Sequence, residues 1–115
     1  MIIAIDFDET LHTGTWPQIG QPKAFAPDTL RRLKEDGHYL IIRTCREGKE
    51  QTDAVNWLLE HNIPFDRIND NHPENTRKYG TNARKVNADL YLDDRQLGGL
   101  PDWSIILDMV RDLKR

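Results

Sequence analysis

Short apolar runs alternate with segments of helical periodicity along the chain, and this alternation constrains the fold more than any other feature. The runs at 2–7 and 39–43 are rich in isoleucine and too short for helices, so they indicate strands buried on both faces. Two further short runs, at 65–68 and 89–92, are interpreted in the same way. The sequence therefore predicts a central, mostly parallel sheet.

Helical segments separate and follow these strands. They are expected from Pro27 to Gly37, from Gly48 to His61, and from Pro101 onward. The polar, glycine- and proline-containing residues 11–26 and 69–82 predict loops. Strands joined through helices pair in parallel by right-handed crossovers. The expected fold class is an α/β three-layer sandwich of Rossmann-like type.

Length and composition limit the classes of protein that this chain can be. Its 115 residues suit one domain, residues 1–115, and its formal charge of −3 argues against general binding to nucleic acids or membrane surfaces. No apolar run approaches the roughly 20 residues of a transmembrane helix, and the first residues lack the basic region of a signal peptide. Cys45 is the single cysteine, which suits a reducing compartment, so a cytoplasmic protein is expected.

Acidic residues stand where the predicted strands end. Asp6 and Asp8 close the first strand, and residues two apart in an extended chain point the same way. Asp93 and Asp94 follow the last strand. Because the carboxyl ends of parallel strands meet at one edge of the sheet, we expect these four carboxylates to converge there.

Such a concentration of negative charge is unfavourable unless a cation neutralises it. Oxygen ligands without a cluster of Cys or His favour a hard ion, most simply Mg²⁺. Taken alone, two aspartates spaced by one residue are a weak signal, and Asp93 with Asp94 could form a solvated turn. The joint pattern, with Thr44 ending the strand at 39–43, favours a functional acidic site.

Three segments resemble the motifs of one family. Residues 6–10, DFDET, resemble the D-x-D-x-T motif of the haloacid dehalogenase superfamily of phosphotransferases. Residues 41–44, IIRT, look like its second motif, and residues 90–94, LYLDD, resemble its acidic fourth motif. The order and strand placement match over residues 1–95. The resemblance implies the α/β core of that superfamily and a Mg²⁺-dependent phosphatase acting on a phosphorylated substrate.

The resemblance also implies roles for these residues. Asp6 would be the nucleophile that forms an aspartyl-phosphate. Asp8 would protonate the leaving oxygen and then activate water, which requires a raised pKa at Asp8. Thr44, with nearby backbone amides such as that of Cys45, would bind phosphoryl oxygens. Four residues would supply the carboxylate or main-chain oxygens that hold Mg²⁺: Asp6, Asp8, Asp93 and Asp94.

The superfamily uses a lysine to balance charge at the nucleophile. Lys85 is the first candidate because it closely precedes the strand at 89–92, and Lys78 and Arg84 are alternatives. Each of them could instead be an ordinary solvated basic residue.

Other residues near the motifs have less specific signals. Arg46 could bind a substrate anion with two hydrogen bonds or form a surface ion pair. Glu9 stands where the superfamily usually has glycine and adds negative charge near the phosphate site. Trp16 is expected to pack a hairpin in the loop at 11–26. The four histidines, among them His12, lack ligand spacing and are interpreted as structural or solvated.

The intervals between the motifs are too short for a cap domain, so an open site is expected. It would admit bulky substrates or be covered by a neighbouring subunit in a homo-oligomer. Two alternatives to the phosphatase stay open. One is a receiver-like phospho-accepting module, which orders its acids, Thr and Lys differently along the chain. The other is a catalytically silent binding protein with the same fold.

Overall fold

A sheet of four parallel strands forms the centre of the computed structural model, which describes residues 1–113. The strands are β1 (Ile2–Asp6), β2 (Tyr39–Arg43), β3 (Arg67–Ile68) and β4 (Leu90–Leu92). Their order across the sheet is β3-β2-β1-β4. Strand β1 pairs with β2 from Ile2 opposite Tyr39 to Asp6 opposite Arg43. The carboxyl ends of the two central strands are therefore level with each other.

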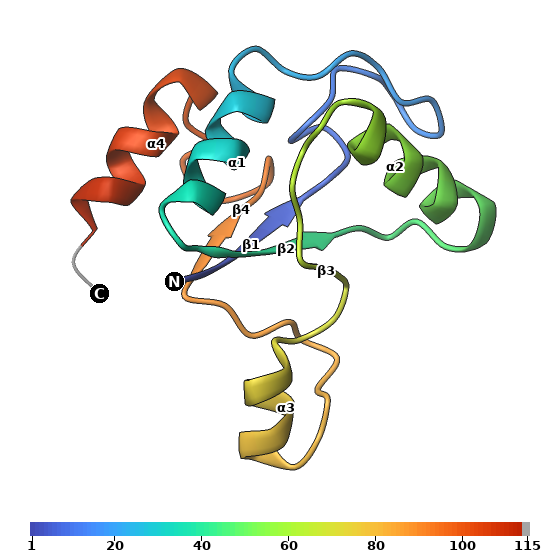
Figure 1. Ribbon diagram of the computed structural model, residues 1–115. Helices are drawn as coiled ribbons and strands as arrows, with labels where there is room; N and C mark the ends of the chain where they lie inside the picture. Colours follow the sequence, from blue (N-terminus) through green and yellow to red (C-terminus); the bar gives the residue numbers. More distant parts are fainter. Residues whose placement is uncertain (114–115) are drawn as a thin grey trace.

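Helices lie on both sides of this sheet (Figure 1). Helices α1 (Ala26–Glu35), α2 (Gly48–Glu60) and α4 (Trp103–Asp112) lie on one face, and α3 (Pro73–Tyr79) lies on the other. Strands β1, β2 and β3 are added in one direction across the sheet, and the chain then crosses back past β1 to form β4. Because each crossover is right-handed, the connection from β3 to β4 lies on the face opposite to α1 and α2. The predicted three-layer α/β sandwich is confirmed, and no cap domain is present in the described residues.

The main core lies between the sheet and the layer of α1, α2 and α4. Alternate strand residues, such as Ile3, Ile5, Leu40 and Ile42, face this layer because successive side chains of a strand point to opposite faces. The buried helix residues that meet them are Leu30, Leu33, Ala54, Trp57, Leu58, Trp103, Ile106 and Val110. A smaller apolar cluster on the other face contains Ala4, Ile41 and Val86. Burial on both faces explains why β1 and β2 are apolar up to their last residues, Asp6 and Arg43.

Two elements differ from what the sequence predicts. The polar segment 69–82 contains α3 rather than only a loop. His72 accepts the N–H of Glu74 at the start of this helix, Pro73 occupies its first turn, and Gly80 ends it at φ 73. No α3 residue is buried, so the apolar periodicity that predicts the other helices is missing here. Strand β3 covers only Arg67–Ile68, although the backbone N–H of Asp66 still donates to the carbonyl of Leu40 at 2.8 Å.

The helices, the single cysteine and the buried tryptophans bear on what composition predicts. None of the helices in residues 1–113 is long and apolar enough to cross a membrane. Cys45 is a free, exposed thiol. Trp57 and Trp103 are buried in the core.

Candidate functional site

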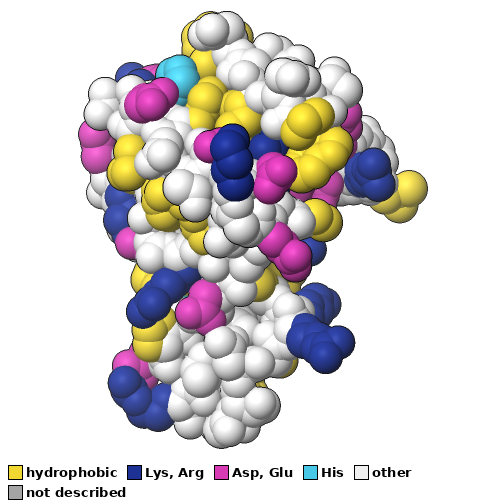
Figure 2. Space-filling view, turned by 90° about the vertical axis from the view of Figure 1, so that its right-hand side faces the viewer, with side chains coloured by type: hydrophobic (Ala, Val, Ile, Leu, Met, Phe, Trp, Pro, Cys, Tyr) yellow, Lys and Arg dark blue, Asp and Glu magenta, His cyan; other side chains and the backbone are white. Residues whose placement is uncertain are grey.

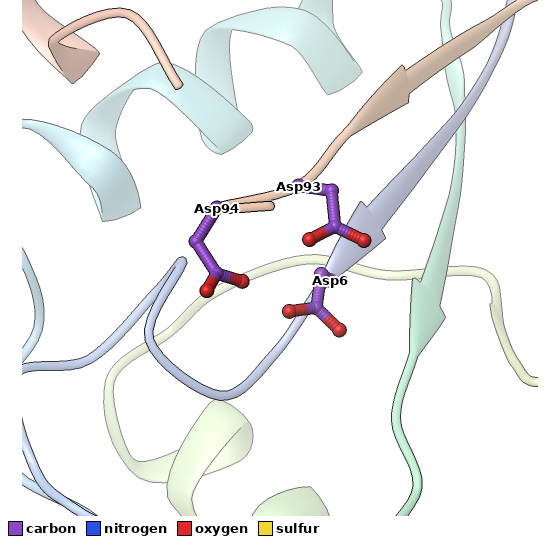
Figure 3. Close-up of side chains that lie close together, drawn as sticks. All are labelled: Asp6, Asp93 and Asp94. Atoms are coloured by element: carbon purple, nitrogen blue, oxygen red, sulfur yellow. The ribbon is translucent and has the colours of Figure 1, made fainter. Parts of the chain in front are cut away.

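Three carboxylates converge at the carboxyl ends of β1 and β4 (Figure 3). Asp6 is the last residue of β1, and Asp93 and Asp94 directly follow β4. One oxygen from each side chain lies within 4.8 Å of the others. The expected convergence is present for these three residues, which come from neighbouring strands far apart in the sequence.

Asp8 does not join this cluster, so the expectation of four converging carboxylates is wrong. Its carboxylate accepts hydrogen bonds from Arg46 Nη2 at 2.7 Å and from Arg46 Nε at 3.0 Å. His12 Nε2 lies 2.9 Å from the same carboxylate. Strand β1 ends at Asp6 and a turn follows, so the alternation of an extended strand no longer determines the direction of the Asp8 side chain.

The crowded carboxylates alter the proton affinity of Asp6. Burial, the hydrogen bond with Asp94 and the negative charge of Asp93 raise the pKa of Asp6 from 3.8 to about 7, against an opposing hydrogen bond from Thr10. Burial also raises the pKa of Asp94, but hydrogen bonds from Asp6 and Thr10 outweigh it and hold that pKa below 3.8. Asp6 therefore keeps a proton close to neutral pH when no cation is present to replace it.

Thr10 connects the ends of β1 and β4. Its buried hydroxyl accepts the N–H of Asp94 at 3.0 Å and lies 3.1 Å from a carboxylate oxygen of Asp94 and 3.3 Å from one of Asp6. The hydroxyl has one proton, so it donates to one of these carboxylates at a time. Trp103 donates its indole N–H to the carbonyl of Thr10 at 2.9 Å, which fixes Thr10 from α4. Thr10 is the last residue of the DFDET motif, but its position in the sequence does not predict these contacts.

The ion pair with Arg46 keeps Asp8 ionised. Burial raises the pKa of Asp8, but hydrogen bonds from Arg46 and His12 outweigh it and lower that pKa below 3.8. The raised pKa expected for Asp8 is therefore wrong in this conformation. The side chain of Arg46 is only 1% exposed, so the alternative of a surface ion pair for Arg46 is also wrong.

His12 is fully buried and holds Asp8 from the other side. Its Nδ1 accepts the N–H of Gly14 at 3.0 Å and that of Gly20 at 3.2 Å, which assigns the ring proton to Nε2 and makes Nε2 a donor to Asp8. The two glycines approach so closely that a Cβ on Gly14 would lie 2.4 Å from Gly20 N. The prediction of a structural histidine is confirmed for His12. Its contact with Asp8 is not visible from ligand spacing, although the glycines and prolines of residues 11–26 predict the loop that makes the contact.

The carboxylates open into a cleft of about 390 Å³. Besides Asp6, Asp8, Asp93 and Asp94, its walls contain Glu9, Trp16, Arg43, Cys45 and Arg95. Figure 2 views the molecule from the side to which β1 and β2 point, and on this face basic and acidic side chains adjoin one another. The two arginines provide the positive charge that an anionic ligand would need beside the aspartates.

Glu9 adopts φ 61, in the left-handed region that glycine occupies most easily. Its exposed side chain lies at the wall of the cleft. The negative charge expected from Glu9 is therefore present beside the site.

Thr44 has a different position from the one expected. Its Oγ1 accepts the backbone N–H of Arg46 at 3.0 Å, and Asn69 bonds both its N–H and its carbonyl, at 2.9 and 2.7 Å. Thr44 shapes the turn after β2 and is not among the residues at the walls of the cleft, whereas its neighbour Cys45 is.

The lysine candidates also lie outside the walls of the cleft. Lys85 is exposed, lies 5.7 Å from the centre of the Tyr91 ring and borders a separate pocket of about 80 Å³. Lys78 lies over the ring of Tyr79 on α3, and Arg84 is exposed. The basic residues that the structure brings to the cleft are Arg43 and Arg95, from the end of β2 and from the loop after β4.

The comparisons with known proteins give one informative similarity. No protein-family model matches the sequence, and no curated protein matches it. A solved structure of a conserved protein from Bacteroides thetaiotaomicron is similar, with 38% sequence identity and a TM-score of 0.87. The similarity covers 100% of this chain and 93% of that one. Identity at this level over nearly the whole of both chains shows common descent as well as a common fold, so the chain belongs to the same family as this conserved Bacteroides thetaiotaomicron protein.

Proposed function

We propose that the protein is a Mg²⁺-dependent phosphatase of the haloacid dehalogenase type, which hydrolyses a phosphomonoester through an aspartyl-phosphate on Asp6. The observation that supports this proposal most is the cluster of Asp6, Asp93 and Asp94 within 4.8 Å, at the strand ends of a parallel α/β sheet. These residues occupy the positions of the acidic motifs that the sequence resembles. Arg43 and Arg95 at the same cleft suit an anionic substrate.

The donor atoms of this cluster fit a divalent cation. They are all carboxylate oxygens, which Mg²⁺ prefers over nitrogen or sulfur ligands. Burial and the neighbouring carboxylates of Asp94 and Asp93 raise the pKa of Asp6, so an added positive charge is favourable here, and a proton provides it when no metal is bound. Asp6, Asp93 and Asp94, with the main-chain carbonyl of Asp8, would hold the ion. When bound, Mg²⁺ would reduce the repulsion between the Asp6 carboxylate and the phosphate dianion.

Asp6 is the proposed nucleophile because it ends a central strand and is held in register opposite Arg43. In its ionised form, an oxygen of Asp6 attacks phosphorus and the bond from phosphorus to the leaving oxygen breaks. Water then attacks the same phosphorus atom, and the bond to the Asp6 oxygen breaks. Inorganic phosphate leaves and the carboxylate of Asp6 is restored.

Asp8 is the proposed acid and base beside the leaving group. The ionised form, held by Arg46 and His12, suits the second step, in which a base takes a proton from water. Protonation of the leaving oxygen in the first step requires Asp8 to lose its pair with Arg46. A phosphate dianion competes for this guanidinium because it accepts the same two parallel hydrogen bonds and carries more charge. We therefore expect the phosphate to displace Asp8 from the Arg46 guanidinium, while the guanidinium keeps its place against the Trp16 ring.

The test is hydrolysis of p-nitrophenyl phosphate with Mg²⁺. The wild-type protein should be active and should lose activity with EDTA, and Asp6→Asn should lower turnover by roughly 10³-fold or more. Asp108→Asn is the matched control, since Asp108 is an exposed residue of α4 away from the cleft. Full activity of Asp6→Asn would contradict the nucleophile. Stable labelling by acetyl phosphate without turnover would instead support the phospho-accepting module.

A further inference from the structure

Trp16 presents an exposed aromatic ring at the wall of the candidate site. The residue is 55% exposed and borders the cleft that contains Asp6 and Asp8. Trp57 and Trp103, by contrast, are 8% and 3% exposed and pack in the core. The expectation that Trp16 packs the hairpin is therefore only partly met, and a large part of its surface is available to a ligand.

Arg46 holds this ring in place. The guanidinium carbon lies 4.7 Å from the centre of the Trp16 ring and 5.4 Å from the centre of the buried Phe7 ring. The guanidinium itself donates to Asp8 and to the carbonyl of Pro17, the latter at 3.2 Å. One side of Trp16 is thus covered by a fixed, buried cation. A ring that is already ordered loses little conformational freedom when a ligand stacks on its open side.

The Arg46 guanidinium contacts both the Asp8 carboxylate and the Trp16 ring. The ring and the carboxylate are therefore separated only by this planar group. In the proposed function, on which this inference rests, Asp8 faces the oxygen that leaves the phosphorus atom. A group attached to that oxygen would therefore lie beside Trp16 while the phosphoryl group stays at Asp6. The described residues contain no cap domain, so the cleft has room for such a group.

We propose that Trp16 is a specificity-determining residue that selects phosphomonoesters whose leaving group has a neutral aromatic ring next to the ester oxygen. The ring of the substrate would stack, offset, on the open side of the indole. A cationic group is disfavoured at this position, because the charge of Arg46 already lies against the other side of the ring.

Two esters with matched leaving groups test this inference. Benzyl phosphate and cyclohexylmethyl phosphate have the same carbon skeleton and similar alkoxide leaving groups, and they differ in the planar ring. With Mg²⁺, the wild-type protein should favour the benzyl ester in kcat/KM by about 2- to 12-fold, the range expected for one aromatic stack. Trp16→Ala should reduce this ratio to about one, and Trp16→Phe should restore part of it. Tyr79→Ala is the control, since Tyr79 is similarly exposed on α3 but does not border the cleft.

Binding without turnover supplies a second readout. Benzylphosphonate, which cannot be hydrolysed, should change the tryptophan fluorescence of the wild-type protein, and Trp16→Phe should lose this change. If both esters are hydrolysed at equal rates, or if Trp16→Ala leaves the ratio of their kcat/KM values unchanged, the specificity inference is wrong. The proposed phosphatase activity is not contradicted by that result. If neither ester nor p-nitrophenyl phosphate is hydrolysed, the phosphatase proposal itself fails, and the inference fails with it.

Discussion

Arg46 and Asp8 form an ion pair in which the guanidinium donates two hydrogen bonds, at 2.7 and 3.0 Å, and the arginine side chain is only 1% exposed. The pair joins the turn after β2 to the turn after β1, and it lies against the rings of Phe7 and Trp16. It therefore connects the acidic site to the hydrophobic core.

Removing one partner of this pair should lower the free energy of unfolding more than removing both charges. Arg46→Met is expected to lower the free energy of unfolding by about 3 kcal/mol, because Asp8 is left partly buried without its cation. The double variant with Asp8→Asn should recover part of that loss. Urea denaturation of the wild type, both single variants and the double variant measures the coupling. Strictly additive effects would show that the two side chains do not interact in solution.

The stability of the metal-free protein should depend on Asp6 between pH 5 and pH 8.5. The folded pKa of about 7 lies above the reference value of 3.8, so the protonated form stabilises the fold at low pH. This contribution is lost as the pH rises through 7. We expect a decrease of about 1–2 kcal/mol, less than the full shift implies, because solvent screens a carboxyl that is only partly buried.

Asp6→Asn should remove most of this pH dependence, since it has no proton to lose. The lowered pKa values of Asp8 and Asp94 affect stability only as the pH falls below about 4, outside this window. Melting temperatures of the wild type and the variant in EDTA, at several pH values, provide the measurement. If the melting temperature of Asp6→Asn decreases equally steeply with pH, the titrating group is a residue other than Asp6.

Mg²⁺ should stabilise the folded protein at pH 8, where Asp6 is ionised. At a concentration 100 times the dissociation constant, a single site adds about 2.7 kcal/mol. For a domain of this size, that corresponds to a rise in melting temperature of roughly 10 °C. Asp93→Asn should lose most of this rise, because Asp93 supplies one of the three clustered carboxylates.

Asp108→Asn is again the matched control and should keep the full effect of Mg²⁺. Calorimetry with and without the ion distinguishes these cases. An identical rise in the Asp93→Asn and Asp108→Asn variants would mean that the cation binds somewhere other than the carboxylate cluster.

The amino-acid sequence was sufficient for the parts of the molecule that rest on local pattern. The apolar residues that fill β1 and β2 up to their charged last positions predict strands buried on both faces, and their alternation with helices predicts parallel pairing. Parallel pairing predicts that Asp6, Asp93 and Asp94 share one edge of the sheet, and the direct pairing of β1 with β4 brings them within 4.8 Å. By contrast, α3 buries no residue, so periodicity could not predict it.

The surroundings of Asp8 depend on contacts between residues that are distant along the chain or lie in an irregular turn. The strand ends two residues earlier, so the direction of the Asp8 side chain is set by Arg46 and by the buried ring of His12. Those two contacts lower the pKa of Asp8, whereas burial, together with the neighbouring Asp94 and Asp93, raises that of Asp6. The strands, their parallel pairing and the edge at which the acids gather are thus encoded in local apolar periodicity, whereas the strand order β3-β2-β1-β4 is a property of the folded sheet. Which carboxylate holds a proton depends on partners that only folding brings within hydrogen-bonding distance.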